Sequence, residues 1–243
     1  MQNFEKTFKV PSNGYFGGPK EVTLRNMTTK EEKILYNAKD YSFLEKIITS
    51  CCVQPKDLDI NTLHPNDILY LIYVLRDLTF GNTYEQEIVC PECEHKQTVT
   101  IDIAQMEALY LDTEGLEEKL TVTLPVSKDT IKLKILSNND INKITKEIKQ
   151  LDRAGKLKDP TTYEFTLKMC ESIVTKNGEE FESFEEKKSY VDTMHLRDSR
   201  AIQNALNSIS FGINTSNIIK CSNCGEEVEV AGLICPEFFR PTK

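Results

Sequence analysis

Four cysteines arranged as two Cys-x-x-Cys pairs are the residues of this chain best suited to chemistry. Cys90 and Cys93 form the first pair, and Cys221 and Cys224 form the second. Each pair begins ten residues after the Phe of a Phe-Gly dipeptide. One pair supplies two thiolates, whereas two pairs supply the four soft ligands of a closed tetrahedral zinc site. We therefore predict one structural zinc ion that all four cysteines hold together.

Other uses of these thiols are compatible with the spacing. A redox dithiol would place one Cys-x-x-Cys at a helix N-terminus, an iron–sulfur cluster or another metal would use the same four sulfurs, and His95 could replace one ligand. The chain has four further cysteines, for which we predict packing or no special role: Cys51, Cys52, Cys170 and Cys235.

The residues around each pair have the alternation of β-strands. In the segment 97–101, Gln-Thr-Val-Thr-Ile, polar and apolar side chains alternate, and Glu-Val-Glu-Val at 227–230 does the same. Pro91 and Gly225 favour a tight turn at each pair. We expect each Cys-x-x-Cys to lie at the tip of a β-hairpin, so that the two hairpins together form a zinc ribbon.

The two pairs belong to a longer internal repeat with an offset of 131 residues. Five of the 18 positions from His64 to Gly81 are identical in the second copy, where chance would give about one. The matches include His64 with His195 and Asp67 with Asp198. Further upstream, 22–24 resembles 131–133 and 8–11 resembles 122–125. We predict that the chain contains two copies of one unit.

The predicted fold class is α+β, with a first repeat at 1–110 and a second at 111–243. Each repeat consists of a β-hairpin, three helices and a thiol-bearing hairpin, and the zinc ribbon joins the two repeats. Capping-box signals at Thr28 with Glu31, and at Ser137 with Asp140, mark the start of the first helix in each copy. The apolar stripe Ile141, Ile144, Ile148 and Leu151, and the set Tyr163, Leu167, Cys170 and Val174, indicate the first two helices of the second copy.

The third helix differs between the copies. Residues 68–75 are apolar on every side, so this helix should be buried all round, at the centre of the molecule or against another subunit. The equivalent residues 201–209 are apolar on one face only. An oligomer is therefore compatible with the sequence. Two aromatic residues near the C-terminus, Phe238 and Phe239, are expected either to fold back onto the core or to anchor a partner.

Composition excludes several classes of protein. The net charge of −8 argues against a nucleic-acid partner, because such proteins need excess lysine and arginine to neutralise phosphate. No stretch of about 18 apolar residues is present, so we expect no membrane span. The first ten residues lack an apolar signal core, so we expect the protein to stay in the cell that makes it.

No set of catalytic residues persuades us that the chain is an enzyme. Motifs for a nucleophile elbow, a phosphate-binding glycine loop or a His-Glu-x-x-His zinc site are absent from the sequence. Asp192, His195 and Asp198 have triad-like spacing, but no nucleophile accompanies them. We interpret His64 and His195 as residues that precede a helix, with Asp67 and Asp198 in its first turn.

The ordered combination of these segments resembles a known family. The residues from Val22 to Lys33, the helix from Asp67 to Phe80 and the knuckle Val89-Cys-Pro-Glu-Cys are similar to the T-even-type tailed-phage baseplate family, which includes baseplate hub subunits and hub assembly factors. The resemblance covers about Val22 to Cys224. It implies a non-enzymatic contractile-tail component, or an assembly factor for one, that binds other baseplate or tail proteins.

The favoured function is therefore a structural or assembly protein of a phage baseplate hub. Its expected location is the host cytoplasm during assembly, with the tail baseplate of the virion as a second expected location. Two alternatives remain open from the sequence. One is a zinc-ribbon adaptor of a cellular complex, and the other is a Cys-x-x-Cys thiol oxidoreductase.

Overall fold

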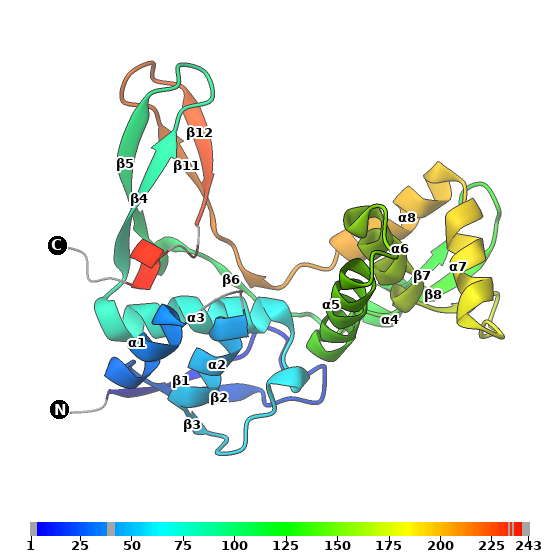
Figure 1. Ribbon diagram of the computed structural model, residues 1–243, viewed down its shortest axis with the longest axis horizontal. Helices are drawn as coiled ribbons and strands as arrows, with labels where there is room; N and C mark the ends of the chain where they lie inside the picture. The colour runs from blue at the N-terminus through cyan, green and yellow to red at the C-terminus, as the bar shows by residue number, and fades with distance from the viewer. Residues whose placement is uncertain (1–3, 38–41, 233, 235, 240–243) are drawn as a thin grey trace. The chain divides into compact units, whose positions relative to one another are not determined.

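The computed structural model describes residues 4–37, 42–232, 234 and 236–239 of the 243-residue chain. The chain forms two compact units (Figure 1). The first unit comprises Met1–Ile60, Pro65–Tyr110 and Phe211–Lys243, and the second comprises Asn61–His64 and Leu111–Ser210. The second unit is thus largely an insertion in the sequence of the first.

The first unit contains a three-stranded antiparallel sheet with the order β1-β2-β3. Two helices lie between β2 and β3 in sequence, and the long helix α3 follows β3. The bounds of these elements are β1 Glu5–Lys9, β2 Glu21–Arg25, α1 Thr29–Tyr36, α2 Ser42–Cys51, β3 Cys52–Gln54, the 3₁₀-helix η1 Ile60–Thr62 and α3 Pro65–Phe80.

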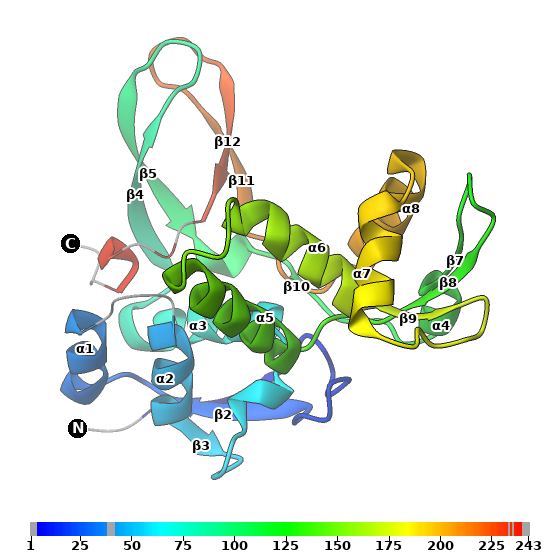
Figure 2. The ribbon, with the colours of Figure 1, turned by 45° about the vertical axis from the view of Figure 1, so that its right-hand side comes forward.

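Two antiparallel hairpins and a short strand pair complete the first unit. The hairpin β4–β5 follows α3, and the hairpin β11–β12 comes from the C-terminal part of the chain; they lie side by side with both tips at the same end (Figures 1 and 2). The bounds are β4 Thr83–Val89, β5 Lys96–Asp102, η2 Ile103–Gln105, β6 Ala108–Leu109, β10 Gly212–Ile213, β11 Ser216–Lys220, β12 Glu227–Ala231 and η3 Pro236–Phe239. Strand β10 pairs with β6, which brings the chain back to the first unit after the insertion.

The second unit repeats the order of the first sheet and its helices. Its antiparallel sheet has the order β7-β8-β9, and two helices separate β8 from β9. The bounds are α4 Leu116–Lys119, β7 Thr121–Thr123, β8 Thr130–Leu133, α5 Asn138–Arg153, α6 Pro160–Ser172, β9 Ile173–Lys176, α7 Phe184–Thr193 and α8 Leu196–Asn207.

The two sheets have matching registers at the segments that look alike in sequence. Phe8 pairs with Val22 in the first unit, and Val122 pairs with Ile131 in the second. A register shift interrupts β2 between Thr23 and Leu24, and another interrupts β8 at the corresponding place. The sheet irregularity therefore occurs at the same step in both units.

The helix that follows the second strand of each sheet, α1 or α5, begins with the capping box that the sequence predicts. Glu31 accepts hydrogen bonds from the backbone and hydroxyl of Thr28, and Asp140 does the same for Ser137. Each of these carboxylates also forms an ion pair with a cation at the end of the preceding strand, β2 or β8. Arg25 lies 2.9 Å from Glu31, and a lysine at 134 lies 3.4 Å from Asp140. Each helix start is thereby fixed to its own sheet.

The third helix is buried all round in the first unit only, as the sequence predicts. Most of α3 lies in the core, including Tyr73, Leu75 and the guanidinium of Arg76. In α8, which occupies the equivalent place in sequence, only Asp198 and Ile202 are buried. In the first unit α3 packs against β2, α2, β10 and the 3₁₀-helices η2 and η3, so more of its surface is covered and apolar.

The C-terminal aromatic residues fold back onto the first unit. Phe238 is fully buried and packs edge-on against Tyr73 and Tyr84, with ring centroids 4.9 and 5.1 Å away. The Nε atom of Arg76 donates a hydrogen bond of 3.2 Å to the carbonyl of Phe238. Of the two expectations for this segment, the structure shows docking onto the core. Residues 240–243, and Cys235, lie outside the described residues.

The second compact unit ends at Ser210, and the hairpin that follows it lies in the first unit, because β10 pairs with β6. Two details of the helices differ from the sequence prediction. Val174 lies in β9, since α6 ends at Ser172. Beyond three helices, the second unit has the additional helix α4 and splits its last helical region into α7 and α8.

The α+β class is confirmed. Among the described residues, no helix has the length and apolar character needed to cross a membrane.

Candidate metal centre

The first Cys-x-x-Cys forms the tight tip of the β4–β5 hairpin. The amide of Cys90 donates to the carbonyl of His95 at 2.9 Å, and the amide of Glu94 donates to the carbonyl of Cys90 at 3.0 Å. Glu94 has a φ of 57°, in the left-handed region that such a turn requires. The turn leaves both cysteine side chains of this pair on one side, where they can bind a common ion.

The second Cys-x-x-Cys forms the same turn at the tip of β11–β12. The amide of Cys221 donates to the carbonyl of Glu226 at 2.8 Å, and the amide of Gly225 donates to the carbonyl of Cys221 at 2.9 Å. Gly225 has a φ of 78° and stands four residues after the first cysteine, as Glu94 does in the other hairpin. Glycine adopts this conformation without steric cost. Both tips were predicted from the sequence.

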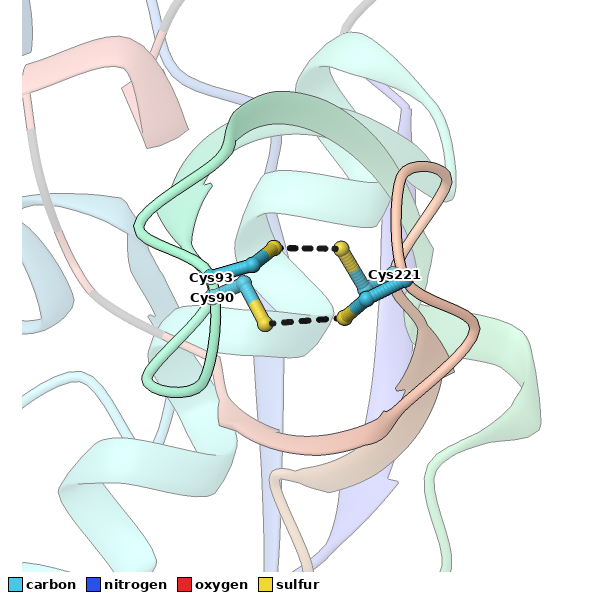
Figure 3. Close-up of side chains that lie close together, drawn as sticks. Cys90, Cys93 and Cys221 are labelled. Carbon is cyan, nitrogen blue, oxygen red and sulfur yellow. Dashed lines mark hydrogen bonds between the residues drawn. The ribbon is translucent and has the colours of Figure 1, made fainter.

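The four sulfurs converge between the two tips (Figure 3). The Sγ atoms of Cys90 and Cys224 are 3.7 Å apart, as are those of Cys93 and Cys221, and all four lie within 4.8 Å of one another. A disulfide needs an S–S distance of about 2.05 Å, so these are separate thiols. A tetrahedral site with Zn–S bonds of about 2.3 Å has sulfur–sulfur edges of about 3.8 Å. The cluster therefore has the size of a four-cysteine metal site.

A glutamine side chain holds the two tips together beside the thiols. Gln97 in β5 accepts hydrogen bonds of 2.7 Å from both the amide and the hydroxyl of Ser222. Its Nε2 atom donates to the carbonyl of Lys220 at 3.3 Å. These contacts join the hairpins through protein atoms alone. Sequence reasoning missed Gln97, which has no neighbouring signal apart from its position within a polar, alternating strand.

Hydrogen bonds at the tips favour thiolates at two of the four positions. The side-chain amide of Asn223 donates to the sulfur of Cys93 at 3.5 Å and, with a backbone amide at His95, lowers the pKa of Cys93 to about 6. Backbone amides at Cys224 and Asn223 lower the pKa of Cys221. Such donors stabilise the deprotonated sulfur that a metal needs as a ligand.

The pKa of Cys224 shifts in the opposite direction. A backbone amide at Glu226 favours the Cys224 thiolate, but hydrogen bonding with the sulfurs of Cys93, Cys221 and Cys90, together with burial, outweighs it and raises the pKa of Cys224 to about 12. Four adjacent thiolates repel one another unless a cation lies between them. The donor set is soft, tetrahedral in size and complete, so it fits a structural metal site with no position left for a substrate.

The other cysteines lie apart from this cluster. Cys51 and Cys170 are buried, and burial raises their pKa values to about 12 and about 11, so they pack as inert apolar groups. Cys52 is half-buried, and its thiol donates to the carbonyl of Pro55 at 3.3 Å. His95 contributes its backbone to the first tip. Among the described residues, the four thiols are the cluster of metal-ligating side chains that lie close together.

The residues with triad-like spacing have structural contacts. The carboxylate of Asp198 accepts hydrogen bonds from the amides of Val126 and Ser127, at 2.7 and 3.0 Å. The ring of His195 caps α8 by accepting from the amide of Arg197. Asp192 pairs with Lys188 on α7. Each contact stabilises a turn or a helix end in the second unit.

Comparison with known proteins identifies the family. The family model described as T4 bacteriophage base plate protein matches residues 1–240, nearly the whole chain. The chain belongs to this T4-type baseplate family. No curated protein and no solved structure matches it.

Membership of the T4-type baseplate family confirms the resemblance drawn from the sequence. It supports a structural role in a phage baseplate and suggests binding to other phage tail proteins and a location in the virion baseplate. Within that family, the chain's four-cysteine cluster is a candidate metal site built from two hairpins of one compact unit.

Proposed function

We propose that this protein is a non-enzymatic structural or assembly protein of the baseplate hub of a contractile phage tail, and that it acts by binding other baseplate proteins. The observation that carries the proposal is the family match over residues 1–240. The closed character of the cysteine cluster supports it, because a tetrahedral four-thiolate site stabilises a fold and offers no position for a substrate.

The roles of the polar residues also favour binding over turnover. Asp67 and Asp198 use their carboxylates to fix loops, since the amide of Ser12 donates to Asp67 at 2.7 Å and two loop amides donate to Asp198. A general base would instead present its carboxylate toward a substrate. Both carboxylates are buried, with relative exposures of 0% and 1%.

The proposed ligand of the cluster is one structural Zn²⁺, held by Cys90, Cys93, Cys221 and Cys224. The ion would supply the positive charge that lets four thiolates coexist, and would fasten the second hairpin to the first. Because the two hairpins come from distant parts of the sequence, this link would close a long loop, which adds to its effect on stability.

We further propose that the two units descend from a duplicated ancestor. Matched features support this reading: the β-β-α-α-β order, the register shift, the capping box with its ion pair, and a buried Asp that binds the turn after the first strand. If the two units are duplicates, the hairpin β11–β12 would be the C-terminal end of the second copy, and it lies beside the hairpin β4–β5 of the first copy.

Purification of phage particles and of assembly intermediates tests the function. We expect the protein, detected by mass spectrometry, either in mature tails or in hub intermediates, and an affinity-tagged chain should recover other baseplate proteins from infected cells. A tagged, unrelated cytoplasmic phage protein serves as the control. Absence from both particles and intermediates, with no baseplate protein recovered, would overturn the proposal.

Metal analysis separates this function from the thiol oxidoreductase alternative. Protein purified anaerobically should contain one zinc per chain, with the four cluster thiols protected from alkylation until a chelator is added. Metal-free protein with two rapidly reactive thiols, and a disulfide that forms and breaks within one Cys-x-x-Cys, would favour the oxidoreductase.

A further inference from the structure

Acidic side chains are concentrated on the two paired hairpins of the first unit. We name residues 83–102 and 216–231, which are the two hairpins with their tips, the acidic ribbon. These two segments contain eight Asp and Glu residues and two lysines, a net charge of −6 in a chain whose total is −8. The exposed acidic residues are Glu85, Glu87, Glu92, Glu94, Glu226, Glu227 and Glu229.

The strand register leaves much of this charge without a cation opposite it. Glu85 pairs across the hairpin with Thr100, and Glu87 pairs with Thr98, so two carboxylates lie in a row on the outer face of β4–β5. On the other hairpin Glu229 pairs with Ile218, an apolar residue that is 73% exposed. Ile218 is thus an exposed apolar side chain on an otherwise acidic surface.

A helix of the second unit carries the opposite charge. Lys143, Lys146, Lys149 and Arg153 are exposed on α5, and their three- and four-residue spacing places them on one side of the helix, named here the basic face. The apolar stripe from Ile141 to Leu151 lies on the opposite side, toward α6. Lys156 and Lys158 continue the exposed positive charge beyond the helix.

The acidic residues within α5 lie at the borders of this face. Glu147 accepts a hydrogen bond from the hydroxyl of Tyr163 on α6, which draws its carboxylate away from the basic face. Asp140 is held by the capping box and by Lys134 at the start of the helix. Asp152 is exposed at the other border, three residues after Lys149. The outward side of this fully described helix therefore presents cations and amides, with acidic residues at its edges.

We propose that the acidic ribbon of one copy binds the basic face of α5 in a second copy. The two surfaces are complementary in sign, and both are exposed. In a two-fold dimer each chain would contribute one acidic ribbon and one basic face, so the contact would form twice. A nucleic acid fits less well, because the acidic ribbon would repel its phosphates.

Sedimentation velocity on the full chain, with its metal retained, tests this self-association. We expect the chain to be a dimer at about 0.1 M salt. At about 1 M salt the dissociation constant of the dimer should rise at least tenfold, because the electrostatic screening length falls from about 10 Å to about 3 Å. A chain that stays monomeric at every salt concentration overturns the proposal. So does a dimer that is insensitive to salt, or one that disappears on nuclease treatment.

Charge reversal on each surface gives a sharper test. The ribbon variant Glu85→Lys/Glu87→Lys and the helix variant Lys143→Glu/Lys146→Glu should each lose self-association by at least tenfold. A mixture of the two should associate again, because each contact then joins opposite charges. This restoration cannot arise from misfolding of either variant, and its failure with two well-folded variants, as judged by circular dichroism, overturns the proposal.

Matched variants control for net charge. Glu180→Lys/Glu182→Lys changes two exposed carboxylates outside the acidic ribbon, and Lys30→Glu/Lys33→Glu changes two exposed lysines outside the basic face. Both controls should associate like the original chain. If they weaken association as much as the surface variants do, overall charge and not the proposed contact is responsible, and the proposal fails.

Discussion

The sulfur of Cys93 lies 3.7 Å from the sulfur of Cys221, although 128 positions separate them in the sequence. The contact joins the tip of one hairpin to the tip of another that the chain reaches only after completing a second compact unit. Each tip supplies two of the four thiols, so neither hairpin has a complete ligand set by itself.

Cys90→Ser and Cys221→Ser are predicted to destabilise the first unit to a similar extent. Each removes one ligand from the same proposed ion, so each should lower metal content and cost more than about 4 kcal/mol, the range associated with loss of a structural metal. Zinc content by elemental analysis and unfolding in denaturant measure the two effects.

Cys52→Ser is the matched control for these variants, because Cys52 is half-buried and lies outside the cluster. It should retain the metal and lose little stability. If only one of the two cluster variants loses metal and stability, the four cysteines do not share one ion.

Glu31→Gln is predicted to lower stability at neutral pH. Burial alone would raise the pKa of Glu31, but hydrogen bonds from Arg25, Ser50 and Thr28 outweigh it and lower the pKa to about 2. A folded-state pKa below the unfolded value of 4.5 gives stability that is present above about pH 4.5 and lost as the pH falls toward 2. The difference corresponds to about 3 kcal/mol.

Urea unfolding of the original chain and of Glu31→Gln at pH 7 and near pH 2.5 measures this effect. The gap between the two proteins should shrink as the pH falls. Glu32→Gln, a change at the exposed neighbour, should show no comparable gap at either pH. A Glu31→Gln penalty that is equal at both pH values would contradict the assigned cause.

Asp67→Ala and Asp198→Ala are predicted to release different loops. Each removes a carboxylate that accepts from backbone amides, a type of charged hydrogen bond whose loss costs about 2 kcal/mol. Hydrogen exchange should accelerate at Ser12 in the first variant, and at Val126 and Ser127 in the second. Equal acceleration at all three amides in both variants would instead indicate general unfolding.

Phe238→Ala is predicted to destabilise the first unit by about 3–5 kcal/mol, the usual cost of removing a buried aromatic ring. The ring is fully buried against Tyr73 and Tyr84. Phe4→Ala removes the same ring where it is 62% exposed, and should cost much less. Thermal unfolding compares the two, and a similar shift for both would mean that the C-terminal segment does not hold the core together.

The sequence was sufficient to predict the elements that short-range signals define. Both capping boxes, both hairpin tips and the difference between α3 and α8 follow from residue types at fixed spacing, and the structure contains them. The convergence of the four sulfurs was also predicted, because the ligand number of a tetrahedral site requires two pairs.

Features that depend on long-range pairing could not be predicted in the same way. Strand β3 begins at Cys52, directly after α2, and its three residues show no alternation that distinguishes them from the helix. The return of the chain to the first unit depends on the two-residue strands β6 and β10, which are too short for any periodicity. Gln97 acquires its role only when Ser222 is placed beside it.

The placement of β11–β12 in the first unit has a consequence for synthesis on the ribosome. The insertion at 111–210 emerges complete while half of the cysteine cluster is still untranslated, so the inner unit can fold before the outer one is closed. Any chain truncated before residue 224 lacks a full ligand set. Only a chain that extends through Cys224 could then bind the ion with four thiolates, and premature termination products would lack the metal link between the two hairpins.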